Sequence, residues 1–176
     1  TVTGINHARL LGPIPTPELL AAADPVRRLL QGRPAAVLPN VFEVVDARDV
    51  AELVSTVLQH DDPAALPALL TASAGTVSER LIADQLRDEF DRRCEHIPWV
   101  RVPRWWVRAL ATIRPTWRRA VAPAPAALTG TDARAIGWLP RELDETITDT
   151  AESVLELEPP GNLFDTVPAA GVLPLR

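Results

Sequence analysis

VFEVVDARDVAELVSTVLQH, at residues 41–60, joins the two patterns that decide the fold. Its first six residues are apolar and β-branched, which predicts a buried strand. The remainder repeats apolar residues at intervals of three and four, which predicts one inward face of a helix. That face consists of Val50, Leu53, Val54, Val57 and Leu58. Asp46 precedes the helix, where a carboxylate stabilises the free backbone N–H groups.

Short strands and helices alternate around this stretch. Residues 2–8 and 67–73 predict strands, and residues 17–31 predict a helix with a break at Pro25. Such alternation indicates an α/β or α+β fold. A strand such as 41–46 should be paired on both edges, and three short strands make a poor sheet. We therefore expect partner strands to be missing from this chain.

Two further helices are predicted towards the C-terminus. The first follows a capping box formed by Thr76 and Glu79. Its inward side is predicted to comprise Leu81, Ile82, Leu86 and Phe90. The second completes a folded region over residues 1–157 and is predicted to turn inward Leu143, Ile147, Ala151, Val154 and Leu155. Residues 158–176 are predicted to form an irregular, Pro-rich tail.

Composition limits what the 176 residues can do. The length suits one domain, and the net charge of −5 argues against a general nucleic-acid binder. Cys94 is the only cysteine, which excludes an intrachain disulfide and a zinc site with several thiolates; no metal site is predicted. The features of a signal peptide and of a membrane span are missing from this sequence, so a cytoplasmic location is expected.

Four segments, taken in order, resemble one family. They are GINHARLLGP, VVDARDVAELVSTVL, LLTASAGTVSERLIADQL and ARAIGWLPRELDETITDTAESVLE. The resemblance is to the extended short-chain dehydrogenase/reductases, which include NAD-dependent epimerases/dehydratases and dihydroflavonol-reductase-like enzymes. It covers about residues 4–157 and matches the C-terminal, substrate-binding half. It implies an α/β fold: the C-terminal part of a Rossmann-type enzyme with a small α+β substrate domain, its sheet incomplete within this chain.

The family's catalytic parts are absent from the sequence. Such enzymes hold the pyrophosphate of NAD or NADP on a Gly-rich turn and use a Tyr acid/base with a Lys four residues later. This chain contains no Tyr, no Lys and no G-x-x-G-x-x-G pattern. We therefore predict no catalytic residue here, and NAD or NADP binding only if another chain supplies a Rossmann half.

By resemblance, Asn6, His7 and Ala8 line the reactive end of the cofactor, although Pro is common in the family where His7 stands. A polar turn at a strand end is the alternative. The resemblance also places Arg9 and Arg48 at the substrate, since a guanidinium can bind phosphate or carboxylate with two hydrogen bonds. The alternative is that Arg48 pairs with Asp49 or faces solvent. We interpret Asp49 as stabilising the helix N-terminus.

The arginine–tryptophan segment, residues 97–131, contains six Arg and no acidic residue. A helix is predicted within it over residues 103–113. The segment is predicted to form a lid whose Trp side chains pack into the core, or a surface for a protein partner. Contact with an anionic membrane surface comes next, and nucleic acid comes last. The residues of this surface are Arg101, Arg104, Trp105, Trp106 and Arg108.

Three functions follow from these features. The leading hypothesis is the substrate-binding half of an NAD(P)-dependent oxidoreductase or epimerase, with the Rossmann half on a companion chain or removed from this one. The second is a degenerate, non-catalytic subunit that acts as an interaction or scaffold protein in a larger complex. The third is a peripheral membrane protein that uses VPRWWVRALATI, residues 102–113.

Overall fold

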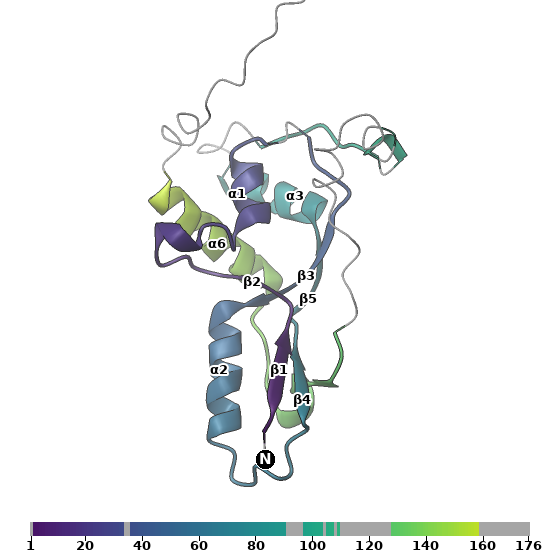
Figure 1. The fold of residues 1–176 in the computed structure, drawn as a ribbon. Coiled ribbons are helices and arrows are strands. Elements are labelled where there is room, and N and C mark those ends of the chain that lie inside the picture. The colour runs from purple at the N-terminus through teal and green to yellow at the C-terminus, as the bar shows by residue number, and fades with distance from the viewer. Residues whose placement is uncertain are drawn as a thin grey trace, which may run out of the picture.

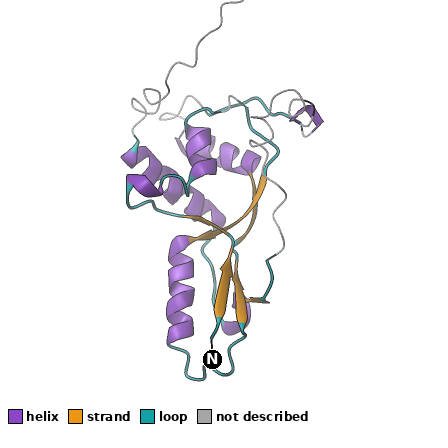
Figure 2. Ribbon diagram, in the orientation of Figure 1, coloured by secondary structure: helices purple, strands orange, loops and turns teal. Residues whose placement is uncertain are grey.

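The computed structural model describes most of the chain as a mixed α/β fold (Figures 1 and 2). The described residues are 2–33, 36–90, 97–103, 105–107, 109 and 128–158, so residues 159–176 of the predicted tail lie outside them. The strands are β1 Gly4–His7, β2 Arg9–Leu11, β3 Val41–Asp46, β4 Leu69–Ala72, β5 Gly75–Ser78 and β6 Thr131–Asp132. The helices are η1 Pro17–Leu19, α1 Asp24–Leu30, α2 Ala47–Leu58, α3 Glu79–Phe90, η2 Ala133–Ile136 and α6 Leu143–Leu157.

The strands form two small sheets of three strands each. One has the order β2-β3-β5, with β2 parallel and β5 antiparallel to β3. β3 is therefore paired on both edges within the chain, so the missing partner strand that the incomplete sheet implies is not one of β3's. β5 was not predicted, because Thr76 within it had been interpreted, with Glu79, as the capping box of the next helix.

The second sheet, β1-β4-β6, is entirely parallel and begins at β1. The predicted strand over residues 2–8 corresponds to β1 alone, and the chain then passes at Ala8 into the other sheet as β2, which was not predicted. The backbone N–H groups of Gly4 and Ala8 donate to the carbonyls of Ala68 and Ala72, both at 2.9 Å. Within the described residues, no strand pairs with the other edge of β1.

α2 begins where the sequence predicted, because Asp46 caps it. The Asp46 carboxylate accepts a hydrogen bond from the Arg48 backbone N–H at 2.8 Å. Leu53 is fully buried, as predicted. Val54 and Leu58 were wrongly placed on the inward face, since they are 41% and 80% exposed.

The ends of two other helices also differ from the prediction. The stretch 17–31 contains only the short η1 and the seven-residue α1, and Pro25 lies in the first turn of α1. Proline is tolerated there because a first-turn N–H has no helical partner. For α3, the capping group is Ser78 rather than Thr76, since the Leu81 N–H donates to the Ser78 hydroxyl at 3.1 Å. Leu81 itself is exposed, contrary to the prediction.

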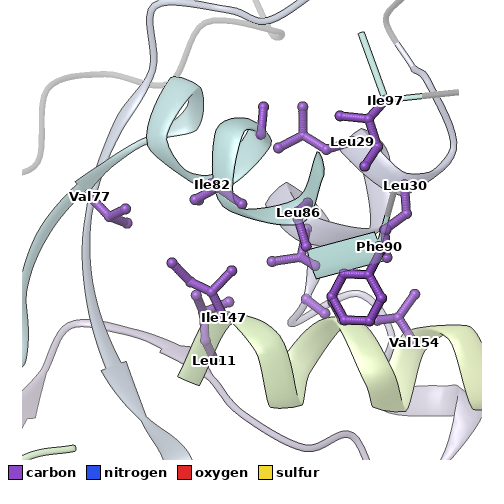
Figure 3. Close-up of a cluster of buried hydrophobic side chains, with 14 of the residues drawn as sticks. Leu11, Leu29, Leu30, Val77, Ile82, Leu86, Phe90, Ile97, Ile147 and Val154 are labelled. Atoms are coloured by element: carbon purple, nitrogen blue, oxygen red, sulfur yellow. The ribbon is translucent and has the colours of Figure 1, made fainter. Parts of the chain in front are cut away.

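The larger core lies between α1, α3 and α6 and the β2-β3-β5 sheet (Figure 3). Ile82, Leu86 and Ile147 are fully buried in it, which confirms the predicted inward faces of α3 and α6 at these positions. Each such side chain contributes about 1.5–3 kcal/mol relative to an exposed one. An ion pair lies at the end of this core, where Nε and Nη2 of Arg27 donate to the Glu158 carboxylate at 2.7 and 2.6 Å.

A smaller core lies between α2 and the β1-β4-β6 sheet. Leu53 of α2, Leu70 and Ala72 of β4, and Trp138 are buried together there, and Ile5 of β1 packs against them. In Figure 1, β1 lies between α2 and β4. The two cores meet where β1 passes into β2 and where β3 ends at α2.

Candidate site at the carboxyl ends of the strands

The predicted cofactor-binding residues lie where the parallel strands end. β1 ends at His7, and its neighbour in register on β4 is Ala72, the last residue of that strand. In open parallel sheets, ligands bind outside the carboxyl ends of the strands. Asn6, His7 and Ala8 thus lie at the carboxyl end of β1, and their role in cofactor binding stays a prediction.

These three residues differ in what they can offer a ligand. Because side chains alternate along a strand, Asn6 and His7 project from opposite faces of the sheet. The Asn6 amide donates to the Thr129 carbonyl at 3.4 Å, and the His7 Nδ1 lies 2.8 Å from the Ala8 carbonyl oxygen. Ala8 is buried, so it shapes this edge by packing, whereas the exposed His7 ring is open to contact.

Arg9 begins β2 on the far side of the strand crossing. Its guanidinium carbon lies 5.1 Å from the centre of the Phe42 ring, within the range of a cation–π contact. Arg9 is exposed. Its predicted substrate role stays a prediction.

Arg48, the other predicted substrate ligand, is bound to two carboxylates. Its Nε and Nη2 donate to the Asp46 carboxylate at 3.0 and 2.7 Å, and Nη2 also lies 2.7 Å from Asp149. The Arg48 side chain is 36% exposed, while that of Asp46 is fully buried. The guanidinium therefore joins the start of α2 to α6, and any ligand there would share it with both carboxylates.

The ionisation of Asp46 follows from this geometry. Burial raises the pKa of its carboxyl, but the hydrogen bonds from the Arg48 side chain and backbone outweigh that effect, so the pKa lies below its usual range. In turn, the hydrogen bond with Asp46 raises the pKa of Arg48. Both groups are charged at neutral pH.

A glycine turn completes this ion-pair cluster. Gly12, which follows β2, has a φ of +115°. Its N–H donates to the Thr150 hydroxyl of α6 at 2.7 Å. A Cβ on Gly12 would lie 2.8 Å from an Asp46 carboxylate oxygen, so only glycine fits this approach without displacement.

A second buried carboxylate holds the segment before α6. Asp49 had been interpreted as stabilising the N-terminus of α2, but its carboxylate binds Arg141, accepting from the backbone N–H at 2.8 Å and from the guanidinium. The Trp138 indole N–H donates to the Asp49 carbonyl at 2.9 Å. The sequence did not predict these contacts of Asp49 with Trp138 and Arg141, because the residues lie about 90 positions apart.

The arginine–tryptophan segment is described only in part, and Arg104 and Arg108 lie outside the described residues. Trp105 and Trp106 are 66% and 49% exposed, and Trp99 is exposed too, so the prediction that these Trp side chains pack into a core was wrong. Trp99 lies over the Arg87 guanidinium at 4.5 Å. Arg101 binds Asp84 of α3 at 3.2 Å.

The described part of the chain has neither a metal-binding cluster nor a membrane-spanning helix. No group of three or more His, Cys, Asp or Glu side chains there could hold a metal ion. No helix among those residues is long and apolar enough to cross a membrane.

Several solved structures share this fold. The chain aligns with yeast methylglyoxal/isovaleraldehyde reductase Gre2, solved with NADPH, at a TM-score of 0.61 and 19% identity, over 89% of this chain and 47% of that one. Vestitone reductase from alfalfa gives 0.54 and 12%, over 88% and 44%. A nucleoside-diphosphate-sugar epimerase from Pseudomonas aeruginosa gives 0.56 and 15%, over 86% and 47%. No protein-family model and no curated protein matches the sequence.

The chain therefore has part of a Rossmann-type extended short-chain dehydrogenase/reductase fold, as the resemblance implied. It spans less than half the length of these three structures. At identities below 20%, the match concerns the fold alone. Function has to be inferred from the site.

Proposed function

We propose that this chain is the substrate-binding half of an NAD(P)-dependent reductase or epimerase of the extended short-chain dehydrogenase type. A Rossmann half supplied by a companion chain would hold the NAD or NADP and provide the Tyr and Lys. The observation that carries the proposal is the match of nearly all of this fold to less than half of the Gre2 fold. The absence of Tyr and Lys from the sequence fits this division.

The residues at the strand ends have roles in this proposal. His7 would face the reactive end of the cofactor, and the small side chain of Ala8 would let the backbone lie close to it. Arg9 is the better-placed of the two candidate substrate ligands, because its guanidinium is exposed and contacts a ring rather than a carboxylate. Arg48 is bound to Asp46 and Asp149 and would hold α2 and α6 together beside the site. It could bind a substrate anion only in competition with these two carboxylates.

The exposed part of the arginine–tryptophan segment would lie over the substrate as a lid, or contact another subunit. Exposed Trp side chains are typical of surfaces that become covered on binding. An anionic membrane surface is the third candidate for this contact, since Trp and Arg are both favoured at membrane interfaces.

The proposal is tested by the motifs in the companion chain's sequence and by the cofactor binding and activity of the two-chain complex. The reading frame beside this one, and the protein that co-purifies with the tagged chain, should both contain a Gly-rich turn and a Tyr-x-x-x-Lys pair. The two-chain complex should bind NAD(P)H or NAD(P)+. It should then either oxidise NAD(P)H in the presence of a carbonyl substrate or interconvert the epimers of a nucleotide sugar with no net change in the cofactor. A companion with neither motif would overturn the proposal in favour of the scaffold role.

A further inference from the structure

Helix α2 has more apolar surface than this chain covers. Its outer face carries Ala47, Ala51, Val54 and Leu58, spaced four, three and four residues apart. All four are exposed, including Leu58 at 80%. At about 100° per residue, these positions form one stripe along the helix. We call it the α2 stripe.

The polar residues of α2 occupy a different arc. Arg48, Glu52, Ser55 and Gln59 follow the adjoining arc of the helix. The α2 stripe therefore lies between the buried face around Leu53 and this polar arc. A surface helix with one packing partner has a single apolar face. An apolar arc that continues past the buried face indicates a second packing partner.

Strand β1, near α2, also has a side without a partner: one of its edges is not paired with any described strand. The Gly4 and Ala8 amides bond to β4, and backbone groups alternate along a strand, so the N–H and C=O groups of Ile5 and His7 point to the other edge. No described strand lies there. Such an edge is a template for another strand.

The two surfaces lie near each other in the fold. Ile5 of β1 packs against the same hydrophobic cluster as Leu53, so β1 and α2 share one core, and in Figure 1 they run side by side. Parallel sheets are almost always covered by helices on both faces, and each added parallel strand arrives with a connecting helix. A strand added to β1 would thus bring a helix within reach of α2.

Resting on the function proposed above, we infer that the edge of β1 and the α2 stripe form one docking surface for a strand–helix unit of the companion Rossmann half. The strand adds parallel to β1 and bonds to Ile5 and His7. The helix packs on Ala51, Val54 and Leu58. The solved structures that share the fold are more than twice the length of the part this chain matches, which leaves room for such a unit.

The experiment compares two matched pairs of substitutions in the native complex, purified through a tag on this chain. Val54→Arg with Leu58→Arg places charges in the α2 stripe, while Ser55→Arg with Gln59→Arg places the same charges on the polar arc. The stripe pair should weaken recovery of the companion by about tenfold or more, because unpaired charge is costly in an apolar interface. The control pair should leave recovery unchanged.

Two further measurements keep the result decisive. Val54 and Leu58 are 41% and 80% exposed, so the variants with either pair of arginine substitutions should keep the wild-type circular dichroism spectrum and urea midpoint. If the Val54→Arg/Leu58→Arg variant unfolds, Leu58→Gln replaces it as a milder change. Amide hydrogen exchange should show Ile5 and His7 protected in the complex and open in the isolated chain.

The outcomes separate the inference from the proposed function. Equal recovery with both pairs, or unprotected Ile5 and His7 amides in a complex with a Rossmann companion, overturns the docking surface alone. A companion that lacks the Gly-rich turn and the Tyr-x-x-x-Lys pair overturns the occupant together with the proposed function. A stripe-dependent dimer of this chain, seen by light scattering, overturns the occupant in favour of a second copy.

Discussion

Gly12→Ala should destabilise the chain through the Arg48–Asp46 pair. Gly12 has a φ of +115°, where an L-residue is strained by about 1–2 kcal/mol. The new Cβ would also lie 2.8 Å from an oxygen of the buried Asp46 carboxylate. Moving that carboxylate weakens charged hydrogen bonds to Arg48, worth about 1 kcal/mol here because the guanidinium is partly exposed to solvent. The expected loss is about 2–3 kcal/mol of unfolding free energy.

Gly137→Ala is the matched control. Gly137 also has a positive φ, +85°, but a Cβ there meets no atom within 4 Å. It should therefore cost only the backbone strain, about 1 kcal/mol. Urea unfolding followed by Trp fluorescence measures both variants. A Gly12→Ala loss no larger than that of Gly137→Ala would refute the close approach to Asp46.

A double substitution locates the effect. Asp46→Ala removes the carboxylate that the new Cβ would touch, so Gly12→Ala should cost less in that background than in the wild type. Such non-additivity is expected only for residues in contact. Equal costs in both backgrounds would assign the loss to backbone strain alone.

Three other predictions concern the ion pairs and the buried Glu79. Asp49→Ala should lower the free energy of unfolding by about 2–3 kcal/mol, because it leaves the Arg141 guanidinium, about one-third exposed, without its buried carboxylate. Glu145→Ala removes the solvent-side partner of the same Arg141 and should cost only about 0.5 kcal/mol. Equal shifts of the urea midpoint would contradict this. Arg48→Lys keeps the charge but loses the two-nitrogen contact with Asp46 and should cost about 1 kcal/mol, again in urea. Burial raises the pKa of Glu79, so its stability contribution is complete below the unfolded pKa of about 4.3 and is lost as pH rises through the folded pKa. Glu79→Gln should flatten that part of the pH–stability curve, and an unchanged slope would count against it.

Local patterns predicted the elements that local forces determine. β3 and α2 occupy the predicted residues because a β-branched run, a capping Asp46 and a helical repeat all act within 41–60. β5 and β6 were missed because a strand of four or two residues exists through pairing with distant neighbours. Periodicity also could not choose which side of the wide apolar arc of α2 is buried, which explains the errors at Val54 and Leu58.

The site was predictable only in outline. The resemblance located Asn6–Ala8 at the end of a strand, where the structure has them. It gave no sign that Arg48 is held by Asp46 and Asp149, because Asp149 is about a hundred positions away in the sequence. Long-range ion pairs of this kind leave no spacing pattern that a single sequence can reveal.

Cofactor binding by the chain alone and by its complex tests the central claim most directly. NADPH fluorescence titrations would compare the purified chain with the same chain and its companion, under identical salt and pH. A chain that is only the substrate-binding half should show no saturable binding alone and saturable binding in the complex. Saturable binding with hydride transfer by the purified chain alone would contradict the account.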